Sequence, residues 1–178
     1  MILALAGRRV DAADAKISRF PEANVEMVRE RVRELLAGKG ASAVVSSAAC
    51  GADLIGLGEA GTLGIRRRVV LPFGRGRFRE TSVMDRPGDW GAVYDRILDQ
   101  VEAVGDLLVL DIASEDDPYA AANSVILDDA VALAKAADEP AGAVLVWDGV
   151  SRGDGDLTED FGVQARKRGL PVMEVLTI

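Results

Sequence analysis

Apolar residues along the chain form short continuous runs that alternate with longer stretches of helical periodicity. Runs of this kind, bounded by glycine or polar residues, predict strands that are buried on both faces of a sheet. We expect six such strands, at residues 2–6, 42–46, 67–73, 107–112, 143–147 and 172–176.

Between these runs, apolar residues recur every three or four positions, as in helices with one buried face. We expect helices at about residues 25–36, from 51 to about 61, at 90–101, 119–137 and 158–168, and a polar loop at 74–82. Alternating strands and helices predict a Rossmann-like three-layer α/β/α sandwich with a mostly parallel sheet of about six strands. We expect one domain spanning residues 1–178.

Right-handed crossovers place every strand-to-helix loop at the same edge of such a sheet. Ligands of open α/β sheets bind at this carboxyl edge, near the point where the strand order reverses. The residues that directly follow each predicted strand are therefore the candidates for a binding site.

Composition narrows the chemistry that this edge can perform. The 178 residues carry a formal net charge of −8, which disfavours a general role in binding nucleic acid. The chain contains no histidine and a single cysteine, so histidine-based catalysis and cysteine-rich zinc sites are excluded. We see no signal peptide and no apolar run long enough to span a membrane, so we expect a cytoplasmic protein with no membrane partner. We also expect no cofactor and no metal, because acidic turns like the one at residues 154–159 are common without a metal.

Two segments of small residues follow the first two strands. Gly7 and Arg8 follow the first; a glycine there lets a ligand approach the backbone, and an arginine can pair with a phosphate. Equally, this can be a turn with solvated arginines. The second segment opens a helix whose first N–H groups can hold an anion, although a tight structural turn would look the same. Its candidate residues are Ser47, Ala48, Cys50 and Gly51.

Cys50 lies where a helix N-terminus could lower the pKa of its thiol and make it a nucleophile. Without a histidine to activate it, a small buried side chain is the favoured interpretation.

The segment after the third strand carries Arg75, Arg77 and Arg79 around Phe78. Three arginines at alternate positions of an acidic protein suggest a phosphate clamp, with Phe78 stacking on a base or anchoring the loop. The alternative is a flexible, solvated loop.

The last candidates follow the fourth and fifth strands. Asn123 shares a helix face with Tyr119 and could hold a ribose or a base edge, or simply lie at the surface. Asp148 or Asp156 could bind a ribose diol. The glycine-rich segment here offers N–H groups to an anion through Gly149, Gly153 and Gly155, but its acidic residues would repel a phosphate, and it can also be a solvated turn.

The ordered set of these segments resembles the SLOG superfamily, in the branch found beside bacterial adenylate cyclase and TPR signalling modules. The resemblance covers nearly the whole chain. It rests on residues 7–11, 19–21, 47–53, 71–73, 81–83 and 146–149, and on Phe78, Tyr119, Ala122, Asn123, Ala165, Gly169, Pro171 and Val172.

This resemblance implies a Rossmann-like fold that binds nucleotides or their derivatives. The SLOG superfamily includes sensor domains and also phosphoribohydrolases that carry a P-G-G-x-G-T-x-x-E motif. The matching segment here, residues 152–159, has Asp154 in place of the second glycine, and Arg8 replaces the histidine expected after the first glycine. Both departures weaken a direct transfer of ligand or activity.

Three hypotheses follow. The first is a sensor domain in signalling or defence that binds a nucleotide-like small molecule. The second is a hydrolase of nucleotide N-glycosidic bonds that uses Glu159 or Glu80. The third is an interaction module that needs no ligand. A homo-oligomer, or an effector domain fused in relatives, is compatible with each of them.

Overall fold

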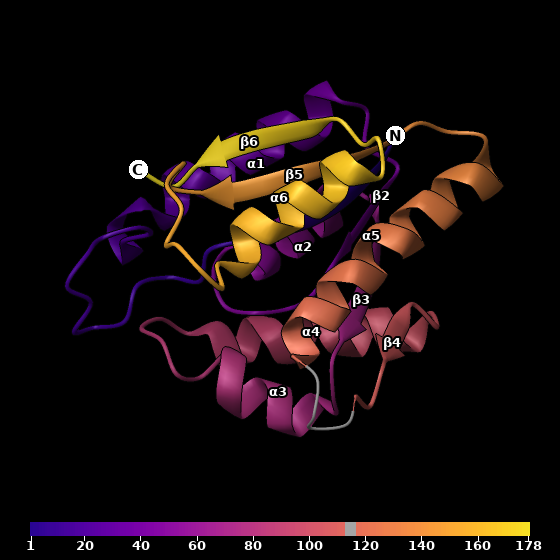
Figure 1. Ribbon diagram of the computed structural model, residues 1–178. Coiled ribbons are helices and arrows are strands. Elements are labelled where there is room, and N and C mark those ends of the chain that lie inside the picture. Colours follow the sequence, from indigo (N-terminus) through magenta and orange to yellow (C-terminus); the bar gives the residue numbers. More distant parts are fainter. Residues whose placement is uncertain (113–116) are drawn as a thin grey trace.

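The computed structural model describes residues 1–112 and 117–178, and these form a six-stranded sheet covered by helices on both faces (Figure 1). All neighbouring strands are parallel, in the order β4-β3-β2-β1-β5-β6. The strands are β1 (Ile2–Gly7), β2 (Ala43–Ser46), β3 (Arg66–Leu71), β4 (Leu107–Val109), β5 (Ala141–Trp147) and β6 (Val172–Leu176). The expected Rossmann-like α/β architecture is confirmed.

The helices connect successive strands. They are a short 3-10 turn η1 (Glu22–Asn24), α1 (Val25–Gly38), α2 (Ala52–Thr62), α3 (Arg75–Ser82), α4 (Trp90–Ala103), α5 (Pro118–Ala137) and α6 (Leu157–Lys167). None of the helices in the described parts of the chain is long and apolar enough to cross a membrane.

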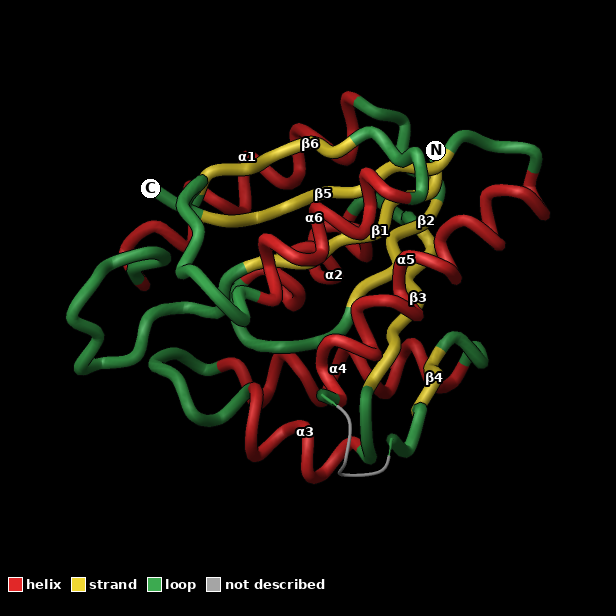
Figure 2. Tube along the Cα trace, viewed as in Figure 1, coloured by secondary structure: helices red, strands yellow, loops and turns green. Residues whose placement is uncertain are grey.

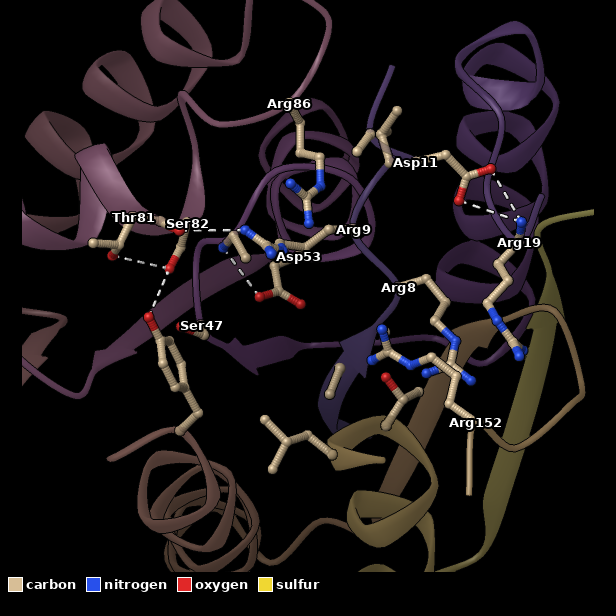
Figure 3. A pocket seen from close by; sticks show the side chains of 18 of the residues that line it. Arg8, Arg9, Asp11, Arg19, Ser47, Asp53, Thr81, Ser82, Arg86 and Arg152 are labelled. Carbon is tan, nitrogen blue, oxygen red and sulfur yellow. Dashed lines mark hydrogen bonds between the residues drawn. The ribbon is translucent and has the colours of Figure 1, made fainter. Parts of the chain in front are cut away.

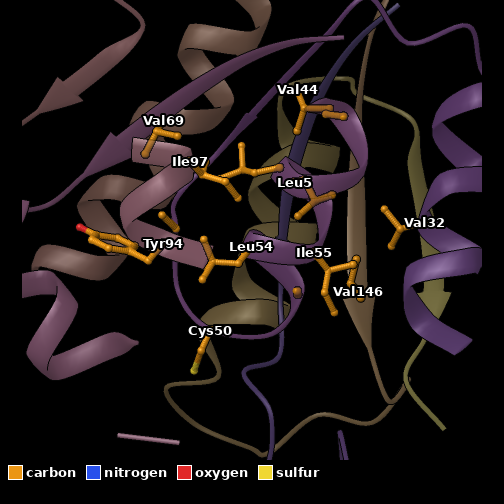
Figure 4. Packing of buried hydrophobic residues seen from close by; sticks show 14 of the residues in the cluster. Leu5, Val32, Val44, Cys50, Leu54, Ile55, Val69, Tyr94, Ile97 and Val146 are labelled. Carbon is orange, nitrogen blue, oxygen red and sulfur yellow. The ribbon is translucent and has the colours of Figure 1, made fainter. Parts of the chain in front are cut away.

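Strand periodicity divides the core into two layers. In β1, Leu3 and Leu5 point to the face covered by α1, α2 and α4, while Ile2 and Ala4 point to the face covered by α5 and α6. Successive strand residues alternate between faces, so a strand between two helical layers must be apolar throughout. Figure 4 shows this packing on the first face, where Leu5 lies among Leu54, Ile55 and Val146.

Two boundaries differ from the sequence prediction. The strand expected at 107–112 ends at Val109, because Asp111 adopts a left-handed backbone conformation with φ +50°. The strand expected to run to Phe73 ends at Leu71, directly before a proline that cannot donate to a sheet ladder.

The larger correction is α3, which occupies the segment expected to be a polar loop. Its sequence has few apolar residues, but Phe78 and Ser82 are buried, and two of its three arginines pair with acidic residues of α4. Arg79 forms a two-pronged ion pair with Asp95, and Arg75 pairs with Asp99 at 2.8 Å and with Glu102. These ion pairs with α4 stabilise α3 as a helix, which its residue propensities alone do not predict.

Candidate functional site

A cavity of about 500 Å³ lies at the carboxyl edge of the sheet, over the ends of β1 and β2. Its walls come from the segment after β1, the turn before α2, the end of α3, the start of α5 and the turn into α6. Figure 2 shows the long loop that follows β1 extending from this edge of the sheet. The chain thus brings five sequence-distant segments to one hollow.

This position is the topological switch point of the sheet. From β1 the chain proceeds through β2 and β3 to β4 on one side, while β5 and β6 lie on the other. The loops after β1 and β5 therefore leave in opposite directions and open a crevice between them. The cavity lies where this fold geometry places ligands, and its size is typical of small-molecule sites.

Two glycines allow the walls of the cavity to approach closely. A Cβ on Gly7 would lie 2.2 Å from the carbonyl oxygen of Val146 and 2.6 Å from the Cβ of Ala52. Gly51 has φ +92°, and a Cβ there would lie 2.8 Å from the carbonyl oxygen of Arg8. Gly7 lines the cavity, whereas Gly51 lies behind its wall and holds the two turns together.

Arginines outnumber carboxylates in the lining. Five arginines reach it, against two aspartates, in a chain whose net charge is −8. Carboxylates behind the wall pair with four of these arginines, so the positive charge available to an anion is smaller than the count of five. The five are Arg8, Arg9, Arg19, Arg86 and Arg152 (Figure 3).

Arg8 has a structural role in place of the phosphate contact expected from the sequence. Its Nε donates to Asp148 at 3.0 Å, and its two terminal nitrogens donate to both oxygens of Asp156 at 2.6 and 2.7 Å. A further N–H reaches the carbonyl oxygen of Val150 at 2.8 Å, and the guanidinium lies 5.7 Å from the ring of Trp147. Four of its five N–H groups are therefore used within the protein.

Asp148 and Asp156 are both buried beneath this guanidinium. Burial alone would raise the pKa of Asp156, but hydrogen bonds from Arg8 and from the N–H of Arg152 hold it well below its usual range. Asp156 also caps α6 by accepting from the N–H of Thr158 at 3.0 Å. Asp148 also accepts a hydrogen bond from Arg19 at 2.6 Å. The carboxylate oxygens that the sequence suggested for a ribose are therefore bonded to arginines.

Asp53 is the buried carboxyl in the cavity wall. It is 7% exposed, and its Oδ2 accepts from the N–H of Ala49 at 3.1 Å. Burial raises the pKa of Asp53 to about 7, although the Ala49 N–H, the charge of Arg9 and the Ser46 hydroxyl oppose the shift. A carboxyl that titrates near neutrality inside a ligand-sized cavity is typical of functional sites.

Only part of the turn between β2 and α2 lines the cavity. Ser47 lines the cavity, whereas Ala48 and Cys50 are fully buried and lie behind it. Burial raises the pKa of the Cys50 thiol to about 12, so the thiol stays protonated at neutral pH. The structure supports the interpretation of Cys50 as a core residue.

On the opposite wall, α5 supplies Tyr119 and Asn123. The Tyr119 hydroxyl lies 3.2 Å from the hydroxyl of Ser82, and its ring meets Phe73 edge-on. Asn123 donates to the carbonyl oxygen of Leu157 at 3.3 Å. Both residues line the cavity, to which they add an aromatic ring and an amide, and their contact with a ligand stays a prediction.

Several predicted site residues lie outside the cavity. Arg75 and Arg79 face α4, and the Arg77 guanidinium stacks 4.3 Å from the ring of Phe73. The remaining glycines of the set shape the turns after β5 with φ of +78°, +89° and +80° but do not line the cavity; they are Gly149, Gly153 and Gly155.

The two candidate catalytic glutamates are also outside it. Glu80 is exposed on α3, and Glu159 accepts a hydrogen bond from Ser151. Among the described residues, no three acidic or cysteine side chains come together as they would around a metal ion.

Sequence reasoning missed Arg86 and its partner Asp85, which connect α3 to α4. Their segment showed no strand end or glycine pattern, so nothing local marked it. The acidic residues of α4 were a usable signal, because Asp95, Asp99 and Glu102 recur at helical spacing and match the spacing of the α3 arginines.

No protein-family model and no curated protein matches the sequence. Among solved structures, the fold is similar to DNA processing protein A (DprA) from Streptococcus pneumoniae, with 16% identity over 96% of this chain and a TM-score of 0.43. It is also similar to the molybdenum cofactor carrier protein MCP from Chlamydomonas reinhardtii, with 15% identity over 98% of this chain, 90% of that chain and a TM-score of 0.35. This chain spans 57% of the DprA chain.

Proposed function

We propose that the cavity at the switch point binds a nucleotide-type small molecule that bears phosphate. The observation that carries the proposal is the gathering of five arginines around one crevice of a chain with net charge −8. Guanidinium groups recognise phosphate oxygens by paired hydrogen bonds, and a crevice enclosed by protein strengthens that attraction.

The cavity lining offers groups that suit both parts of such a ligand. The phosphate would lie against the arginines, with Arg9, Arg86 and Arg152 as its closest partners. The base or sugar would lie towards Tyr119, Asn123 and Leu157, which combine an aromatic ring, an amide and an apolar side chain. Small-molecule sites commonly show this mixture of apolar wall and few polar groups.

Binding without bond cleavage is the function we favour. Glu159 and Glu80 lie outside the cavity, and the cavity has no histidine to act as a base. The SLOG resemblance of the sequence supports a ligand sensor in signalling or defence.

A second candidate, hydrolysis of a nucleotide N-glycosidic bond, is favoured by Asp53 alone. A buried carboxyl with a pKa of about 7 can protonate a leaving base while water adds to the sugar carbon. Release of free base from nucleoside monophosphates, abolished in Asp53→Asn with binding retained, would establish it.

The direct test is isothermal titration calorimetry, with thermal unfolding, against nucleoside mono- and diphosphates, cyclic nucleotides and nucleotide sugars. A ligand at 100 times its Kd stabilises the fold by about 2.7 kcal/mol, a rise of roughly 5–10 °C in Tm for this chain length. Arg152→Ala should weaken binding. Arg75→Ala, which removes an ion-paired arginine outside the cavity, should leave it unchanged.

A flat response of folded protein to the whole panel contradicts the proposal and favours an interaction module. An equal loss of binding affinity in Arg152→Ala and Arg75→Ala would mean that the ligand binds outside this cavity.

A further inference from the structure

The cavity arginines fall into two groups, each assembled around its own carboxylates. The first, the Asp85 group, consists of Arg9 and Arg86 with Asp85. Arg9 donates to both oxygens of Asp85 at 2.9 and 2.8 Å, and Arg86 donates to one of them at 2.9 Å. Two guanidinium groups share one carboxylate, so the group has one positive charge in excess.

The second, the Asp156 group, consists of Arg8, Arg19 and Arg152 with Asp148 and Asp156. Arg8 and Arg19 already occupy the oxygens of the two carboxylates at 2.6 to 3.0 Å. Arg152 is left with an Asp156 oxygen at 3.9 Å, its nearest carboxylate partner among the described residues. Three cations against two anions again leave one positive charge in excess.

This excess lies on Arg152, whose side chain is 54% exposed and lines the cavity. Burial lowers the pKa of Arg152, and the charges of Arg8, Arg19 and Arg9 lower it further, with Asp156 opposing them. Arg9 and Arg86 of the other group line the same cavity as Arg152, so the two excess positive charges face one opening. An anion between them would be the counter-charge of both groups.

Figure 3 shows the two groups on different sides of the same opening, with Arg9 and Arg86 on one side and Arg8, Arg19 and Arg152 on the other. Asp53 lies in the wall near Arg9. A single phosphate can neutralise one group by contact, whereas two linked phosphoryl groups can contact both.

We propose that the ligand carries two linked phosphoryl groups, one held by Arg9 and Arg86 and the other by Arg152, as in a nucleoside diphosphate. This inference rests on the proposed function and narrows its ligand class. Each group then supplies the counter-charge for one phosphoryl, and Asp53, when protonated, can donate a hydrogen bond to the bridge.

The test compares matched pairs of ligands by isothermal titration calorimetry at pH 6.5. The pairs are inorganic phosphate with pyrophosphate, and the 5′-mono- with the 5′-diphosphates of adenosine, guanosine, cytidine and uridine. We expect the second phosphoryl to tighten binding by about tenfold or more, the scale of one added charged hydrogen-bond contact.

Arg152→Ala and Arg86→Ala should each lose most of this preference, because each removes one of the two anchors. Arg75→Ala is the matched control and should retain it. Arg152→Gln and Arg86→Gln repeat the test with longer side chains, should either alanine variant unfold, and circular dichroism verifies each fold.

Equal affinity for mono- and diphosphates overturns this inference while the proposed function stands. Retention of the diphosphate preference in both the Arg152 and Arg86 variants overturns it too. Failure of every nucleotide to bind folded wild-type protein overturns the proposed function itself.

Discussion

Replacing Arg8 by methionine should destabilise the protein far more than replacing an exposed arginine of the same kind. The substitution keeps most of the side-chain volume but removes the guanidinium from two buried carboxylates, leaving Asp148 with Arg19 alone and Asp156 without its two-pronged partner. The side chains of Arg8, Asp148 and Asp156 are at most 4% exposed, so water cannot compensate. Removing one partner of a buried ion pair costs about 3–5 kcal/mol.

For a chain of this length, each kcal/mol shifts Tm by about 2–4 °C, so Arg8→Met should unfold roughly 6–20 °C below wild type. Urea unfolding, followed by tryptophan fluorescence, measures the free energy directly; Trp147 lies beside Arg8 and reports on this region. The matched control is Arg66→Met. Arg66 forms a two-pronged pair with Asp106, but 52% of its side chain is exposed, so we expect a loss below about 1 kcal/mol.

The pH dependence of the folding stability tests the same role of Arg8 independently. Because the folded-state pKa of Asp156 is lowered, its pairing stabilises wild type above the unfolded pKa and is lost as pH falls through the folded pKa. In Arg8→Met the buried Asp156 carboxyl loses its guanidinium partner and can take up a proton, so the difference from wild type should shrink between pH 7 and pH 4. A loss at pH 7 no larger than that of Arg66→Met would refute this account of Arg8.

Three further predictions concern the cavity walls. Gly7→Ala should lower the free energy of unfolding in urea by more than about 3 kcal/mol, because the added Cβ would lie 2.2 Å from a backbone oxygen that cannot move aside. Gly76→Ala on α3, where the added Cβ meets open space, should leave stability unchanged or raise it by about 0.5–1 kcal/mol. Equal effects of the two substitutions would contradict this account of Gly7. Because the folded-state pKa of Asp53 is raised, part of the wild-type stability should be lost as pH rises from about 4 to 7, and anion binding should weaken over the same range. Both trends should be absent in Asp53→Asn. Their persistence in that variant would assign them to another group. Cys50 should resist Ellman's reagent at pH 8 in the folded protein and react fully in urea, whereas rapid reaction of the native thiol would contradict its burial.

The sequence was sufficient for the sheet because the central strands β1, β2 and β5 are continuous, mostly apolar runs, and burial on both faces leaves few alternatives. The same pattern located the edge of the sheet at which the cavity lies. Local sequence was insufficient for α3, where Arg75 and Arg79 looked like phosphate ligands. Their partners are acidic residues of α4, whose helical spacing is visible in the sequence, but the packing of the two helices was needed to show which arginines they pair with.

Arg8 illustrates the same limit at longer range. Its partners Asp148 and Asp156 lie 140 and 148 residues further along the chain. Sequence inspection found all three residues and assigned each of them to a ligand. The sheet order places β1 beside β5, and this adjacency lets the arginine and the aspartates satisfy each other.

The central claim is that the switch-point cavity binds a phosphate-bearing nucleotide, and an NMR titration of the ¹⁵N-labelled protein tests it most directly. The titrant is the tightest-binding nucleotide of the calorimetric panel. We predict saturable shifts of the backbone amides of Gly7, Arg9, Ser47 and Arg152, with the amides of Gly76 and Arg79 on α3 unmoved. Shifts confined to α3 and α4, or no shift at saturating nucleotide, would contradict the account.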